Sequence, residues 1–182
     1  FILKDYDVVL GMLERRMDGV GGRSSQVRHA IAQILSGKAP KPTQLHQSLI
    51  KLANRGSAIT IATTNFDLLL EAAAKRGKYD VQSYALDAIP RPSSRDEFAG
   101  IFHIHGALST NSDRLTDLVV SDQDFGELYL RRRAIPDFIY DAARLFHIVL
   151  VGYSANDPPM RYLLNAVAAD GSRFSDLKER YT

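Results

Sequence analysis

Apolar residues recur at helical spacing through the first third of the chain. Between positions 2 and 17 they stand three or four residues apart, and Gly19–Gly22 interrupts the pattern. Two further helices are expected at 25–35 and 43–53. Residues 1–56 therefore predict a helical segment that opens the domain.

From residue 57 onward, short apolar runs alternate with helical patterns. The sequence predicts strands at 58–62, 81–85, 101–104, 118–120 and 148–151, and helices at 66–75, from the turn around Pro136 to 146, and at 158–169. Ser121–Asp124 resembles a capping box. This alternation indicates a Rossmann-like α/β fold, with a mostly parallel sheet and helices on both faces. We expect one domain, in which residues 57–182 form the core and residues 1–56 the preceding helical segment.

Three of these strands end in small, hydrogen-bonding residues. Thr63-Thr-Asn-Phe-Asp67 follows the first, His105-Gly106 follows the strand at 101–104, and Gly152-Tyr-Ser-Ala-Asn-Asp157 follows the strand at 148–151. In open α/β sheets, ligands bind in the crevice outside the carboxyl ends of the strands. We therefore expect one site, assembled from three strands.

Composition narrows the class of protein. The chain has 182 residues, is 45% apolar, carries a formal charge of +2 and contains no cysteine. The missing cysteines exclude disulfides and thiolate zinc sites. The charge is too small to require a nucleic-acid partner, and no apolar stretch approaches the ~20 residues of a membrane span. We expect a soluble, cytoplasmic protein.

The three motifs resemble those of the sirtuin-like domain family, in particular a bacterial branch that consumes NAD in defence against phage. Residues 63–67 match the Thr-Thr-Asn-aromatic-Asp of that branch, and His105-Gly106 matches its His-Gly motif. Residues 152–158 match its Gly-aromatic-Ser-x-x-Asp-Pro. The resemblance runs from about residue 57 to 168, and the order of the motifs agrees as well as their residues.

The resemblance implies that NAD is bound and that its nicotinamide-ribosyl bond is hydrolysed. It implies that Asn65 orients the ribose or the attacking water and that Asp67 lies near the nicotinamide carboxamide. His105 would act as the base, because imidazole exchanges protons near neutral pH. The remaining residues of the implied NAD-binding set are Thr63, Thr64, Gly106, Gly152, Ser154 and Asp157.

Each of these residues also has a structural interpretation. Asn65 could cap a helix that begins at Phe66, where Asp67 would offset the helix dipole in the first turn. Asp157 could likewise cap the helix that follows it. A lone strand histidine is more often structural than catalytic, and we expect His103 to support the site. The run Arg131–Arg133 is most simply a solvated helix face, although it could contact nucleic acid.

Two departures from the family shape the expectation. Protein-deacylating sirtuins carry a four-cysteine zinc module, so its absence here favours simple hydrolysis, and no metal is expected. The family's glycine-rich strand-loop cradles the pyrophosphate, but the candidate at Gly19–Ser24 follows a helix. We therefore expect that loop upstream of Phe1, and the chain to be part of a longer protein. Without that strand, the isolated chain should bind NAD poorly and present a sheet edge that invites self-association.

Two other classes of function remain open at this point. One is a module that senses NAD or ADP-ribose without turning it over. The other is a structural or nucleic-acid-assembly domain, for which Arg131–Arg133 is the sequence support.

Overall fold

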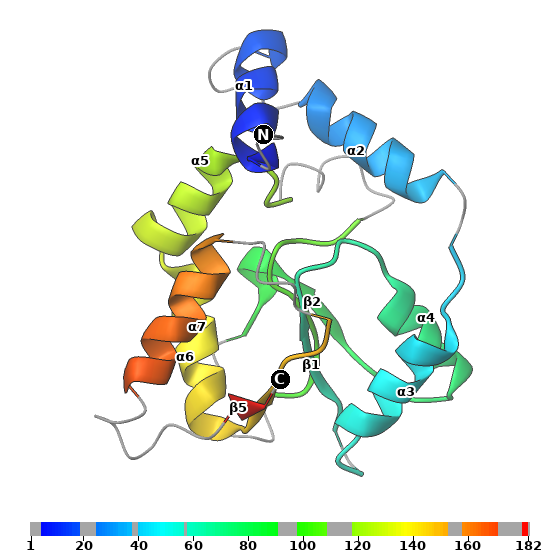
Figure 1. Ribbon diagram of the computed structural model, residues 1–182. Helices are drawn as coiled ribbons and strands as arrows, with labels where there is room; N and C mark the ends of the chain where they lie inside the picture. The colour runs from blue at the N-terminus through cyan, green and yellow to red at the C-terminus, as the bar shows by residue number, and fades with distance from the viewer. Residues whose placement is uncertain are drawn as a thin grey trace. The chain divides into compact units, whose positions relative to one another are not determined.

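The computed structural model describes residues 5–18, 25–37, 40–56, 58–90, 98–108, 118–152, 158–170 and 180–181 (Figure 1). These residues belong to two compact units. The first takes the described residues up to Pro90 and from Phe98 to Asp124, and the second takes those from Phe125 onward.

The first unit opens with three helices. They are α1 (Tyr6–Asp18), α2 (Gln26–Ser36) and α3 (Gln44–Ala53). α2 begins after Ser25, whose hydroxyl oxygen accepts a hydrogen bond from the main-chain N–H of Arg28 at 3.1 Å. The helical pattern of the first third of the chain is therefore confirmed, and the helices predicted at 25–35 and 43–53 match α2 and α3 within one residue. α1 begins at Tyr6, and the pattern that precedes Asp5 lies outside the described residues.

Strands and helices then alternate, as predicted. β1 (Thr60–Thr63), α4 (Leu69–Arg76), β2 (Ser83–Ala85), a 3₁₀ turn (Leu86–Ala88) and β3 (Gly100–His103) follow in that order. β3 is the middle strand and pairs in parallel with both others, in the order β1-β3-β2. The described strands of both units pair in parallel only, which confirms the predicted α/β class.

α3 and α4 cover one face of this sheet (Figure 1). Their apolar side chains form a core with those of β3 and of the residue before β1, namely Ile50, Ile59, Leu70, Ala73, Ala74 and Ile101. The opposite face of β3 carries Phe102, whose ring stacks on Tyr84 at 5.4 Å and lies 4.9 Å from the ring of Phe98. Both faces of β3 are buried, so its ends are held firmly in place.

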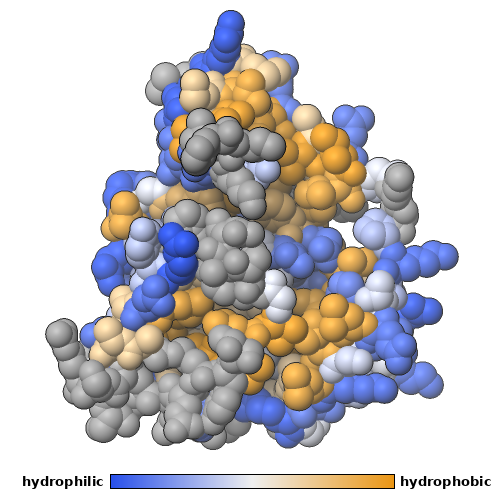
Figure 2. Space-filling view, in the orientation of Figure 1, coloured by the Kyte–Doolittle hydropathy of each residue, from blue (hydrophilic) through white to orange (hydrophobic). Residues whose placement is uncertain are grey.

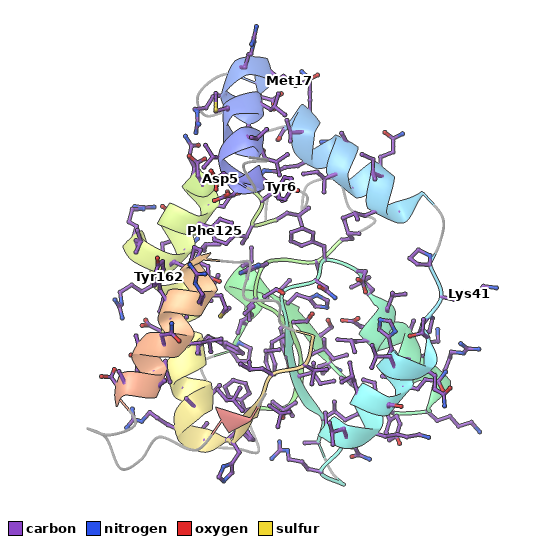
Figure 3. The ribbon with its side chains drawn as sticks, viewed as in Figure 1. Asp5, Tyr6, Met17, Lys41, Phe125 and Tyr162 are labelled. Carbon is purple, nitrogen blue, oxygen red and sulfur yellow. The ribbon has the colours of Figure 1, made fainter. Side chains whose placement is uncertain are left out.

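α1 is anchored by polar contacts and by Leu10, which packs against the cluster of Ala32, Leu118 and Val120. Its side chains Tyr6, Val9, Met12, Leu13 and Met17 are exposed, and apolar surface gathers over α1 and α2 (Figures 2 and 3). Glu14 of α1 instead pairs with the buried Arg28 of α2, at 2.7 Å. Arg28 also binds the Asp124 carboxylate at 2.7 Å and donates to the main-chain oxygen of Leu118. The pKa of Arg28 is raised: burial acts to lower it, but the bonds to Glu14 and Asp124 outweigh that effect.

The predicted strand at 118–120 is wrong. Leu118, Val119 and Val120 are buried but join no sheet. Their main-chain groups bond elsewhere, because the Leu118 oxygen accepts from Arg28 and the Val120 N–H donates to Asp124 at 3.0 Å.

The predicted capping box is confirmed at the start of α5 (Asp122–Phe125). Asp124 accepts from the Ser121 N–H at 2.9 Å, and its own N–H donates to the Ser121 hydroxyl oxygen at 3.4 Å.

The second unit contains a π-helical stretch (Gly126–Arg131), α6 (Ala134–Leu145), β4 (Ile148–Val149), α7 (Pro158–Asp170) and β5 (Arg180–Tyr181). The Tyr140 hydroxyl of α6 donates to Asp170 of α7 at 2.6 Å. The helices around Pro136 and at 158–169 are thus confirmed. The strand predicted at 148–151 forms only at Ile148–Val149, where it pairs in parallel with β5 in a two-stranded sheet.

Candidate functional site

The carboxyl ends of β1 and β3 lie side by side. Thr63 and His103, the last residues of the two strands, are partners in the parallel register. One further bond continues the pairing, from the Ile104 N–H to the Thr63 oxygen at 3.0 Å, and another joins Leu108 to the Phe66 oxygen at 2.7 Å. Two of the three motifs predicted to meet, Thr63–Asp67 and His105-Gly106, are therefore adjacent in the first unit.

The loop after β1 has a different form from the one expected. α4 begins at Leu69, so Asn65 does not cap it and Asp67 is not in its first turn. The Asp67 carboxylate instead accepts from the Leu69 N–H at 3.1 Å, two residues ahead. Phe66 packs against the apolar cluster of Ala32, Leu118 and Val120, so residues 65–67 do not join α4. The Asn65 side chain is left exposed, while Thr63, Thr64 and Asp67 are half-buried.

His105 follows β3 in a turn and is only 5% exposed. Burial lowers its pKa to about 4, so the imidazole is neutral at pH 7. Its main-chain oxygen accepts from the Val119 N–H at 2.9 Å, which ties the turn to the segment that Arg28 holds. Gly106 has a φ of +91°, a left-handed conformation that favours glycine. The turn that carries His105 is thus held beside the Asn65 loop.

His103 is fully buried and contacts the same loop. Its Nδ1 lies 3.0 Å from the main-chain oxygen of Asn65, and its Nε2 lies 2.6 Å from Oε1 of Glu71 in α4. Ser83, the first residue of β2, donates its hydroxyl to the same Glu71 oxygen at 2.6 Å. Burial acts to lower the pKa of His103, but the bond to Glu71 and its negative charge outweigh this and raise that pKa.

Glu71 was missed by the sequence reasoning. Burial acts to raise its pKa, but the hydrogen bonds from His103 and Ser83 outweigh burial and lower it. The signal was present: Glu71 stands between Leu70 and Ala74 on the apolar side of α4, where a carboxylate needs a partner. His103 lies two residues after Ile101 on the buried strand β3, so the two side chains share one face. An imidazole on that inward face could have been expected to be the partner of the carboxylate.

The third motif belongs to the second unit. Gly152 is exposed there, with a φ of +67° that favours glycine. Ser154 and Asp157 lie outside the described residues, as does the Gly19–Ser24 stretch. The role of the third motif in the site therefore stays a prediction.

Three further features of the described residues bear on metal, membrane and nucleic-acid interactions. Among them, no group of three or more His, Cys, Asp or Glu side chains could hold a metal ion. None of the helices described is both long and apolar enough to cross a membrane. In the basic run, Arg131 pairs with Glu127 and Arg133 with Asp137, as expected of a solvated helix face.

Comparison with known proteins identifies the family. Residues 59–181 match the SIR2-like domain. The chain belongs to the SIR2-like domain family. The resemblance drawn from the three motifs is thereby confirmed at the level of the family, and SIR2-like domains use NAD.

One curated relative of this SIR2-like domain covers nearly all of the chain. It is the uncharacterized protein y4cA of Sinorhizobium fredii (strain NBRC 101917 / NGR234), 38% identical over 183 residues. The match takes in 97% of this chain and 15% of that protein, so the chain spans about a seventh of the relative's length.

Proposed function

We propose that this SIR2-like domain binds NAD and hydrolyses its nicotinamide-ribosyl bond, within a protein of bacterial defence against phage. The observation that carries the proposal is the adjacency of the Thr63–Asp67 and His105-Gly106 motifs, which follow two neighbouring parallel strands of a SIR2-like domain. The defence role rests on the resemblance of the three motifs to the phage-defence branch.

The proposed chemistry needs two kinds of group, one that accepts a proton and one that positions the reactants. Cleavage of a glycosidic bond passes through a transition state with oxocarbenium character, so a positioned nucleophile and a proton acceptor accelerate it. His105, neutral at pH 7, accepts a proton from a ribose hydroxyl or from the attacking water. Asn65 has an exposed amide that orients the ribose or that water.

The other predicted residues bind NAD. Asp67 uses Oδ1 to accept from the Leu69 N–H, so we assign its second oxygen to the nicotinamide carboxamide. Thr63, Thr64 and Gly106 border the same loops, and Gly152, Ser154 and Asp157 are assigned to the adenosine half by the resemblance. Water is the favoured acceptor of the ADP-ribosyl group, because a chain without cysteine cannot build the zinc module of protein-deacylating sirtuins.

One observation favours a second candidate, an NAD- or ADP-ribose-sensing module. A general base works best when its pKa lies near the working pH, and a pKa of about 4 makes His105 a weak base at pH 7. A site with this histidine could bind the dinucleotide and leave it intact.

Measurement of nicotinamide release by the full-length protein, together with NAD titration calorimetry, separates the two candidates. We expect release by the wild type and a loss of about 10²–10⁴-fold in His105→Gln and in Asn65→Ala, with NAD affinity changed by less than about threefold. Glutamine is preferred to alanine at position 105 because the side chain is buried and alanine would leave a cavity. NAD binding without release would establish the sensing module, and a wild type that neither binds nor cleaves NAD would refute both.

The matched control is His29→Gln. His29 is an exposed histidine of α2, and its ring contacts the Ser25 main-chain oxygen at 2.9 Å. This variant should release nicotinamide at the wild-type rate. The defence role is tested in bacteria that carry the gene: NAD should fall after phage infection with the wild type and stay constant with His105→Gln.

A further inference from the structure

We infer that Glu71 and His103 act as a positioning pair for the Asn65 loop, in which a half-buried carboxylate holds a buried imidazolium that in turn holds the main chain at Asn65. The inference rests on the function proposed above, because it gives the pair a role in NAD cleavage. Neither residue is assigned to touch the substrate.

Because the pKa of Glu71 is lowered and its carboxylate is ionised near neutral pH, the two hydrogen bonds together require the charged form of His103. Its two ring nitrogens face two acceptors, the Asn65 main-chain oxygen at 3.0 Å and the Glu71 carboxylate at 2.6 Å. A neutral imidazole has one N–H and can donate to only one of them, whereas imidazolium donates to both. His103 is fully buried, so water cannot replace a lost bond.

The charges around His103 favour the same form. Two carboxylates act on it, Glu71 from α4 and Asp67 from the loop before that helix. From β2, the Ser83 hydroxyl donates to Glu71, which stabilises the carboxylate. Burial opposes both charges, yet the pKa of His103 is raised and that of Glu71 is lowered. The ion pair is therefore intact only over a limited pH range. It is lost at high pH, where His103 loses its proton, and at low pH, where Glu71 gains one.

This pair fixes one side of Asn65 while Thr63 fixes the other. The Asn65 N–H donates to the Thr63 hydroxyl oxygen at 3.1 Å, and the Asn65 oxygen accepts from His103. The exposed amide of Asn65 thus projects from a main chain held at both ends. A displacement of about 1 Å in a reacting group can cost 10²-fold in rate, so loosening this main chain should lower kcat more than it raises KM.

The test compares four forms of the full-length protein by nicotinamide release from pH 6 to 10, namely wild type, His103→Gln, His103→Lys and Glu71→Gln. His103→Gln removes the charge, and we expect kcat to fall about tenfold or more while KM changes by less than about threefold. Glu71→Gln should act in the same direction. His103→Lys keeps a cationic donor and should restore most of the loss.

The pH profile separates positioning from a merely structural role. Wild-type kcat should fall at alkaline pH as the imidazolium titrates. In His103→Lys this fall should move toward the pKa of lysine, about 10.4, and His29→Gln should keep the wild-type profile. If His103→Gln fails to fold by circular dichroism, the profile of His103→Lys decides the matter.

Three results would overturn the inference. The first is kcat within twofold of wild type in both His103→Gln and Glu71→Gln, and the second is an alkaline fall at the same pH in His103→Lys. Either one, with an active wild type, refutes the pair and leaves the proposed function standing. The third is a wild type that releases no nicotinamide, which refutes the proposed function and the inference with it.

Discussion

Burial of His105 should make the protein less stable in acid. Its folded-state pKa of about 4 lies below the ordinary value of 6.5. Between these two values the unfolded chain binds more protons than the folded one, so the free energy of unfolding falls as the pH falls from about 6.5 to about 4. At 1.36 kcal/mol per pKa unit, the contribution of this one side chain is about 3 kcal/mol. Below about pH 4 both states are protonated, and the contribution no longer changes.

Urea unfolding of wild type and His105→Gln, followed by circular dichroism from pH 7.5 to pH 4, measures this contribution. Carboxylates titrate in both proteins and cancel in the difference between the two free energies. That difference should shift by about 3 kcal/mol across the range, in favour of the variant at low pH. The same substitution at the exposed His147 provides the control. Parallel curves for wild type and His105→Gln would show that His105 is not held neutral by burial.

Two further predictions concern stability, each measured by chemical unfolding at pH 7.5. Arg28→Ala leaves the partly buried carboxylates of Glu14 and Asp124 without their cation and should lower the free energy of unfolding by about 3–5 kcal/mol. Arg16 is exposed, so Arg16→Ala should lower it by less than about 0.5 kcal/mol. Equal losses in the two variants would show that the ion pairs of Arg28 do not stabilise the fold. Gly100→Ala should cost at least about 1–3 kcal/mol, because φ is +146° and the new Cβ would lie 2.7 Å from the Tyr84 ring. Gly126→Ala, where a Cβ meets no atom within 4 Å, should be nearly neutral, and an equal loss there would refute the steric argument.

Local patterns were predictable because the interactions that decide them lie within a few residues. Ser121 and Asp124 are three positions apart, and their capping box formed as expected. The helices near residues 25–35 and 43–53 follow in the same way from apolar spacing and an N-terminal Ser or Thr. The adjacency of the Asn65 and His105 motifs was also predictable, because both follow strands of one parallel sheet.

Interactions between distant residues decided the rest. Leu118–Val120 has a strand-like composition, but Arg28 donates to its main chain from 90 positions away. The start of α4 moved to Leu69 because Phe66 packs into a cluster that includes residues of α2. Glu71 and His103 are 32 positions apart, and each has an unremarkable role when taken alone.

The order of the strands sets the time at which the site can form during synthesis. β3 lies between β1 and β2 although it follows both in the chain, and the described strands β1 and β2 pair only with it. As the polypeptide leaves the ribosome, neither β1 nor β2 can therefore form its strand pairing until residues 100–103 emerge. Closing the β1–β3 contact, which joins Thr60 to Gly100, also carries the loop-closure entropy of a non-local pairing. His105 is two residues behind β3, so a nascent chain acquires its sheet and both adjoining motifs in the same step.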